Sequence, residues 1–73
     1  MGRRRVLSGA EAAAILRANG FIEVRRKGSH VVMQMKLPNT TITVPIPDHR
    51  ELKGGTLAAI IRQSRLPRDL FES

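Results

Sequence analysis

Two very short connections in the middle of the chain constrain its fold more than any other feature. Segments 21–26, 30–37 and 40–44 alternate apolar and polar residues and are rich in β-branched side chains, which is typical of half-buried strands. Only residues 27–29 and 38–39 separate these segments, and connections this short join antiparallel neighbours. The sequence therefore predicts a three-stranded antiparallel sheet in which consecutive strands are neighbours.

The same alternation predicts which residues share each face of the sheet. The apolar set, expected to pack on the rest of the protein, is Ile22, Val24, Val31, Met33, Met35, Ile42 and Val44. The opposite set is Glu23, Arg25, His30, Val32, Gln34, Lys36, Thr41 and Thr43. This second set is too polar to be covered, so we expect one face of the sheet to stay open. Pro45 and Pro47 are expected to end the third strand.

Helical periodicity flanks the predicted sheet on both sides. Ser8 should cap a first helix that ends near Asn19, and Glu11 should complete a capping box with it. Gly20 supplies the left-handed stop. The inner face of this helix is expected to carry Ala12, Ile15, Leu16 and Asn19. Thr56 should cap a second helix, and its inner residues are expected to be Leu57, Ile60, Ile61 and Ser64.

The order helix, three antiparallel strands, helix is an α+β layout with both helices on one face of the sheet. Double-stranded-RNA-binding domains share this α-β-β-β-α layout, although a fold alone does not give a function. The 73 residues are expected to form a single domain, in which residues 1–6 are a flexible basic tail. A short terminal turn over residues 69–73 should place Leu70 and Phe71 against the core.

Charge is the strongest clue in the composition. A formal net charge of +7 attracts nucleic acid, an anionic membrane or an acidic protein. Aromatic residues are limited to Phe21 and Phe71, which favours contacts to backbone phosphates over base stacking. The absence of cysteine excludes disulfides and thiolate metal sites, and two histidines alone make a poor zinc site. No apolar stretch is long enough to span a bilayer, so we expect a cytoplasmic protein without a membrane contact.

Several short motifs give the chain a resemblance to a known family. They are Leu7-Ser8-Gly9 with Glu11, Ile15-Leu16, Gly20-Phe21, Arg25, Gly28-Ser29-His30, Val44-Pro45, His49 with Glu51, Gly54-Gly55-Thr56-Leu57 and Ile60-Ile61-Arg62-Gln63. In this order and spacing the sequence resembles the HicA, or YcfA-like, family of toxin ribonucleases. It departs from the family at Ser64-Arg65, where many relatives have Ala-Gly, so the second helix lacks the expected terminal glycine.

The resemblance implies a small endoribonuclease that cleaves messenger RNA without a metal or another cofactor. It implies that His30, in the Gly-Ser-His motif, is the catalytic histidine. It also implies a HicB-type antitoxin that binds and silences the toxin. Because the chain is strongly basic, the contacting surface of that antitoxin is expected to be acidic.

The physical reading of His30 agrees with this implication. His30 should begin the second strand on the open face, and Arg25 of the adjoining strand should point to the same side. Cleavage without a metal needs a base for the 2′-hydroxyl proton, an acid for the leaving 5′-oxygen and cations for the charge on the phosphorus. An imidazole suits either proton role, since its unperturbed pKa is ~6.5. The alternative is a turn histidine that bonds a backbone carbonyl.

The turn before His30 and its flanking cations are the expected RNA contacts. These residues are Arg25, Arg26, Lys27, Gly28, Ser29 and Lys36. Backbone amides and the hydroxyl of Gly28 and Ser29 would approach a phosphate closely. The alternation of the strand places Arg26 on the inner face. The alternative for Arg26 is therefore an ordinary surface charge that does not contact RNA.

A second proton-transfer residue is not evident in the sequence. His49 is a candidate if its loop approaches the open face. Pro45 and Pro47 instead suggest a rigid turn, and we favour a structural role in which His49 or Glu51 bonds the loop backbone. Two other classes of function remain possible from the sequence. One is a non-catalytic RNA-binding module, and the other is a protein-binding domain whose positive charge attracts an acidic partner.

Overall fold

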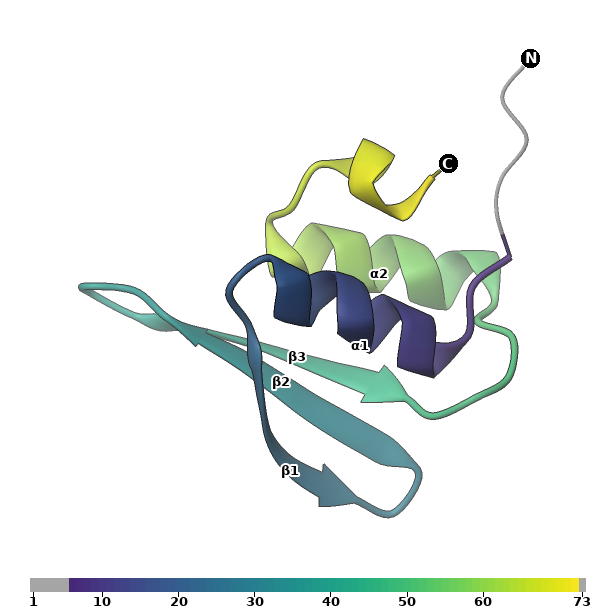
Figure 1. The fold of residues 1–73 in the computed structure, drawn as a ribbon, viewed down its shortest axis with the longest axis horizontal. Helices are drawn as coiled ribbons and strands as arrows, with labels where there is room; N and C mark the ends of the chain where they lie inside the picture. Colours follow the sequence, from purple (N-terminus) through teal and green to yellow (C-terminus); the bar gives the residue numbers. More distant parts are fainter. Residues whose placement is uncertain (1–5, 73) are drawn as a thin grey trace.

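A computed structural model describes residues 6–72 of the chain, and its elements follow the predicted order (Figure 1). They are α1 (Gly9–Ala18), β1 (Ile22–Lys27), β2 (His30–Lys36), β3 (Thr41–Pro47), α2 (Gly54–Ser64) and a short 3-10 helix, η1 (Arg68–Phe71). Most of the expected basic tail, residues 1–5, lies outside the described residues, as does Ser73. Val6 is exposed.

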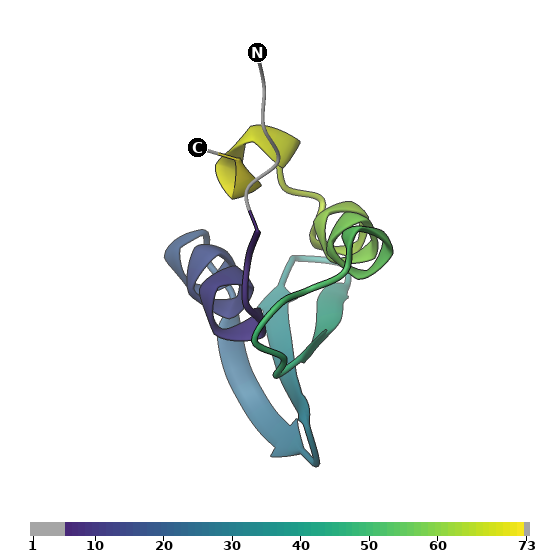
Figure 2. The same ribbon diagram turned by 90° about the vertical axis from the view of Figure 1, so that its right-hand side faces the viewer.

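The strands form one antiparallel sheet in the order β1-β2-β3. Both helices cover the same face of this sheet and leave the other face open (Figure 2). α1 contacts all three strands, whereas α2 contacts β3. The predicted α+β layout, which double-stranded-RNA-binding domains share, is confirmed.

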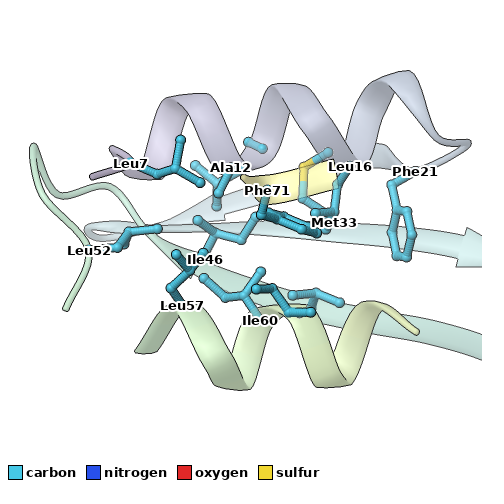
Figure 3. Packing of buried hydrophobic residues seen from close by; sticks show 14 of the residues in the cluster. Leu7, Ala12, Leu16, Phe21, Met33, Ile46, Leu52, Leu57, Ile60 and Phe71 are labelled. Atoms are coloured by element: carbon cyan, nitrogen blue, oxygen red, sulfur yellow. The ribbon is translucent and has the colours of Figure 1, made fainter. Parts of the chain in front are cut away.

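A single apolar core lies between the helices and the sheet (Figure 3). Its largest fully buried side chains include Phe21, Phe71, Leu7, Leu16, Met33, Ile46 and Val44. Every strand residue in this core belongs to β2 or β3, because all six residues of β1 are exposed. β1 is therefore held chiefly by its hydrogen bonds to β2.

The start of α1 has the predicted capping box. The hydroxyl of Ser8 accepts from the Glu11 amide at 3.0 Å, and the Ser8 amide donates to the Glu11 carboxylate at 2.9 Å. Gly20 has a φ of 100° and supplies the predicted left-handed stop. The inner face of α1 differs from the prediction at Asn19, which is exposed. The Asn19 side chain donates to the carbonyl oxygen of Ile15 at 2.8 Å.

The first turn of α1 packs closely on the segment that follows β3. The Gly9 amide donates to the carbonyl oxygen of His49 at 2.8 Å, and the Leu52 amide donates to that of Leu7 at 2.8 Å. A Cβ atom at Gly9 would collide with the carbonyl oxygen of Pro47. Only glycine therefore allows this approach of helix to strand end.

β3 continues through Pro45, which was expected to end it, and ends at Pro47 as predicted. Ladder bonds join the Leu37 amide to Thr40 and the Asp48 amide to Ser29. Hydrogen-bonded pairs in an antiparallel ladder alternate along the strand, so Pro45 and Pro47 occupy the intervening positions. The backbone nitrogens there face away from β2, and because β3 is an edge strand the missing N–H groups cost no ladder bond.

A bulge in β1 changes the faces predicted for its first residues. The register shifts between Glu23 and Arg25, which leaves Val24 without a partner in β2. Ile22 pairs with Gln34 and therefore lies on the open face, where it is 60% exposed. Glu23 lies on the helix side. The predicted faces of Ile22 and Glu23 are thus wrong, and Val24, which was predicted on the packed face, is 41% exposed. The predicted face of Arg25, after the bulge, is correct.

α2 begins earlier than predicted. Its N-cap is Lys53, without a side-chain cap, and the Leu57 amide donates to the Lys53 carbonyl at 2.9 Å. Gly54 and Gly55 are thus already helical, so Thr56 lies inside the first turn and is not the cap. The predicted inner residues of α2 are all buried: Leu57, Ile60, Ile61 and Ser64.

The C-terminal end of α2 closes without glycine. Arg65 adopts the left-handed conformation, with a φ of 63°, at the position where glycine was expected from the resemblance. The buried hydroxyl of Ser64 donates to the Ile61 carbonyl at 2.8 Å and accepts from the Leu66 amide at 3.2 Å. In the terminal turn Phe71 is buried as predicted, but Leu70 is 41% exposed.

The strain at Arg65 predicts that glycine stabilises the protein. Arg65→Gly should raise the free energy of unfolding by about 0.5–1 kcal/mol, because glycine adopts the left-handed conformation without a Cβ clash. Urea titration measures the change. Arg65→Ala is the matched control, since it removes the same charge but keeps the Cβ atom. Equal stabilisation by both variants would show that the charge, and not the backbone conformation, is responsible.

Candidate active site

His30 is the first residue of β2 and follows a two-residue turn. Gly28 and Ser29 form this turn, and Gly28 has a φ of 58°. Ser29 has no positive φ, so the pair follows the pattern of a type II′ hairpin turn. A Cβ atom at Gly28 would meet only open space, which means that backbone conformation alone requires glycine here.

The strand register brings most of the predicted site residues to one face. His30 lies between Lys27 of β1 and Pro47 of β3, and the next pair of this face joins Arg25 to Val32. Directly paired residues point to the same side of a sheet, so the side chains of His30, Lys27 and Arg25 share the open face. All three are exposed. The sequence predicted the shared face of His30 and Arg25. It placed Lys27 in the turn, whereas Lys27 is the last residue of β1.

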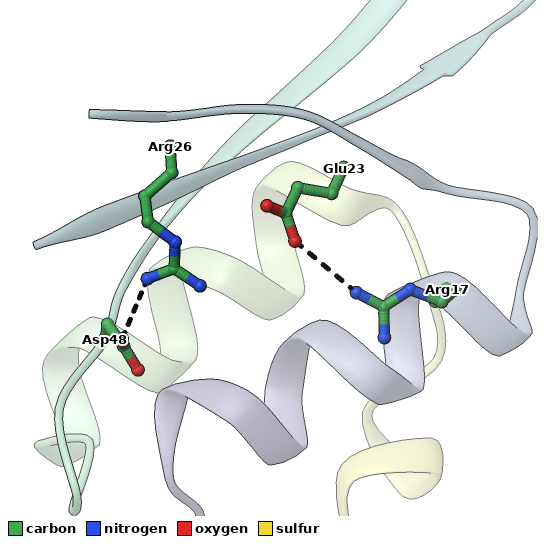
Figure 4. Close-up of polar contacts among 4 residues, drawn as sticks. All are labelled: Arg17, Glu23, Arg26 and Asp48. Carbon is green, nitrogen blue, oxygen red and sulfur yellow. Dashed lines mark hydrogen bonds and ion pairs between the residues drawn. The ribbon is translucent and has the colours of Figure 1, made fainter.

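The open face is cationic and has no acidic residue at the paired positions of its three strands. Two acids beside the sheet, Glu23 and Asp48, lie toward the helix side and contact arginines (Figure 4). Glu23 pairs with Arg17 of α1 at 3.7 Å, and Asp48 pairs with Arg26 at 2.9 Å. No carboxylate on this face therefore offsets the charges beside His30.

Arg26 and Lys36 lie apart from the other predicted RNA contacts. Arg26 pairs with Val31, so its side chain is on the helix side, as its phase in the strand predicted. There its guanidinium donates to the carboxylate of Asp48. Lys36 is on the open face but ends β2, six residues from His30, which is about 20 Å along a strand.

His49 takes part in the fold through its backbone. Its carbonyl oxygen accepts the Gly9 amide, while its side chain is exposed. The predicted hydrogen bond from the His49 or Glu51 side chain to the loop backbone is not present among residues 6–72. The sequence did not point to Asp48, whose carboxylate accepts from the guanidinium of Arg26. Its one distinguishing feature in the sequence is its position directly after Pro47.

Residues 6–72 contain neither a metal-ligand cluster nor a membrane-spanning helix. No three His, Cys, Asp or Glu side chains of this region gather as ligands for a metal ion. Within the same region, neither helix combines the length and the apolar character that crossing a bilayer requires.

Comparison with known families places this geometry in context. A family model described as the HicA toxin of bacterial toxin-antitoxin systems matches residues 9–66. The matched stretch runs from the start of α1 to just beyond α2 and includes the whole sheet with His30. A search of curated proteins found no match. The family match covers well over half of the chain, which therefore belongs to the HicA family of toxins from toxin-antitoxin pairs.

Proposed function

We propose that this toxin is an endoribonuclease that cleaves messenger RNA in the cytoplasm with His30 and without a metal ion. The observation that carries the proposal is the position of His30: an exposed imidazole on a sheet face with cations on the adjoining strand and no paired acid. Such a face attracts the RNA backbone and also brings a proton-transfer group to it.

The proposed reaction is an internal transfer at phosphorus. As the 2′-oxygen attacks the adjacent phosphate, His30 either accepts the 2′-hydroxyl proton or donates a proton to the leaving 5′-oxygen, and water makes the other proton transfer. The bond to the 5′-oxygen breaks, which leaves a 2′,3′-cyclic phosphate and a 5′-hydroxyl end. Lys27 and Arg25 would stabilise the added negative charge on the phosphate oxygens.

The proposed RNA contacts fall into two groups. Beside His30, Arg25, Lys27, Gly28 and Ser29 hold the phosphate at the cut. Lys36, at the far end of β2, holds a more distant phosphate. Arg26 would contact RNA only from the helix side, where Asp48 already engages its guanidinium.

Regulation follows from the same surface. We propose that a HicB-type antitoxin covers His30 and the open face with an acidic surface of its own. Masking the site stops a small enzyme directly, and complementary charge speeds association.

The variant His30→Ala tests the proposed chemistry. It should lower the rate of RNA cleavage ~10²- to 10⁴-fold, because the proton-transfer group is gone. The free energy of unfolding should change by no more than about 0.5 kcal/mol, since the side chain is exposed. Cleavage of a fluorescent RNA and urea titration measure the two quantities. Loss of toxicity in cells should accompany the loss of cleavage.

Three controls accompany this variant. Wild-type activity should survive a chelator, and RNA with hydrogen in place of the 2′-hydroxyl at the cut position should resist cleavage. His49→Ala should cut at the wild-type rate. Wild-type activity in a folded His30→Ala protein would refute the assignment and make His49 the next residue to test.

Phosphate contacts should make RNA binding depend on salt. The logarithm of the affinity should fall with the logarithm of the salt concentration by roughly 0.7 per phosphate neutralised on a single strand. Replacing Arg25 and Lys27 together by glutamine should lower this slope in a His30→Ala background. Replacing Arg62 and Arg68 by glutamine is the control, since neither lies on the sheet. Equal slopes for both double variants would argue against the open face as the RNA surface.

Amide hydrogen exchange tests the proposed antitoxin contact. In the complex, exchange should slow in the turn at Gly28 and Ser29, and it should stay unchanged in the exposed outer part of α1. Complex formation with no change at the turn would place the antitoxin elsewhere.

A further inference from the structure

We infer that Asp48 is a positioning residue for His30, and that it acts with Arg26 as a clamp on the helix side of the sheet. This inference rests on the proposed function, because it assigns Asp48 a role through the chemistry of His30. The Arg26–Asp48 clamp is defined by the ion pair between these two side chains and by the backbone bond of Asp48 to Ser29.

Asp48 is held at two points, and both lead to the turn that carries His30. Its amide donates to the carbonyl oxygen of Ser29 at 2.6 Å. Its carboxylate accepts from Nη1 of Arg26 at 2.9 Å (Figure 4). One side of the turn is thus tied through Ser29, and the other through the strand that enters the turn.

The ion pair joins the two edge strands across the central one. Arg26 belongs to β1 and Asp48 follows the last residue of β3, so β2 lies between them. Two strand spacings separate the edges, which is roughly 10 Å. The arginine side chain, the 2.9 Å contact and the side chain of Asp48 together span this distance. The link passes on the helix side of β2 near its first residues, and the side chain of His30 projects from the opposite side.

The hairpin has little else to fix its position. β1 contributes no buried residue, and residues 27–30 are all exposed. The turn therefore depends on the strand ladder and on the clamp. Proton transfer is sensitive to such placement, because a shift of about 1 Å at a reacting group can cost as much as 100-fold in rate.

A purely stabilising role does not explain this pair. The side chains of Arg26 and Asp48 are 51% and 47% exposed, and ion pairs at such exposure add little to stability. The Arg17–Glu23 pair is comparable, with 55% and 37% exposure, and it also involves β1. It leads to α1, however, and does not touch the turn. The chain thus offers a matched control for the loss of an exposed ion pair.

The test compares Asp48→Ala with Glu23→Ala in the full chain. Both should unfold at similar urea concentrations. Asp48→Ala should lower kcat for RNA cleavage about 10- to 100-fold with KM within about twofold of the wild type. Glu23→Ala should leave both values unchanged. Asp48→Glu, which keeps the carboxylate, should restore most of kcat, and Arg26→Gln should reproduce the loss.

Two further measurements separate this inference from the proposed function. In a His30→Ala background, Asp48→Ala should cause no further loss, because a positioning residue acts only through the group that it positions. Amide exchange at residues 27–31 should become faster in Asp48→Ala and not in Glu23→Ala, and this reading requires no cleavage.

The outcomes are distinct. Equal kcat values for Asp48→Ala and Glu23→Ala, or unchanged exchange at the turn, overturn the clamp. Full activity of His30→Ala overturns the proposed chemistry instead, and with it the role assigned to Asp48. A loss of kcat with faster exchange in the turn, rescued by Asp48→Glu, supports the inference.

Discussion

Backbone hydrogen bonds of residues 48–52 tie this segment both to the β1–β2 turn and to the start of α1. The Asp48 amide reaches the β1–β2 turn, the His49 carbonyl receives the first amide of α1, and the Leu52 amide binds Leu7 before that helix. The approach is so close that Gly9 has no room for a Cβ atom. Backbone bonds are the suitable link here, because a small domain has few buried side chains with which to fix loops.

The placement of both helices leaves one face of the sheet uncovered. Both helices are placed on the same side, and the core is completed there by Phe21, Phe71 and the inward residues of β2 and β3. The acids nearest the sheet, Glu23 and Asp48, are paired with arginines of the helix side. Positive charge is left on the open side, where a polyanion can approach without displacing any part of the core.

The sequence predicted those features that depend on local chemistry or on simple periodicity. The Ser8–Glu11 capping box, the glycine stop at Gly20 and the buried residues of α2 all follow from neighbours within one or two turns. The face of His30 was also predictable, because β2 has no irregularity between His30 and Lys36. The alternation of apolar and polar residues predicted the face of each side chain wherever the strand was regular.

The errors have physical causes that lie outside such local patterns. The bulge at Val24 reverses the faces of Ile22 and Glu23. A run of alternating residues does not indicate where a strand contains an extra residue. The place of Pro45 in β3 depends on which β2–β3 pairs are hydrogen-bonded, and the sequence does not show this. The Arg26–Asp48 contact joins residues 22 positions apart. At Arg65 the sequence showed that the expected glycine is missing. Only the structure shows that arginine adopts the left-handed conformation in its place.

The role that we propose for His30 places two demands on it that usually conflict in a small protein. A group that must meet a macromolecular substrate has to be exposed, yet exposure normally allows a side chain and its loop to move. His30 is exposed, but its backbone begins the central strand and is paired on both sides, with Lys27 and Pro47. A site carried on a regular strand is more rigid than one on a loop. Order around His30 therefore comes from the strand ladder, together with the Arg26–Asp48 clamp that we infer, and not from burial of its side chain.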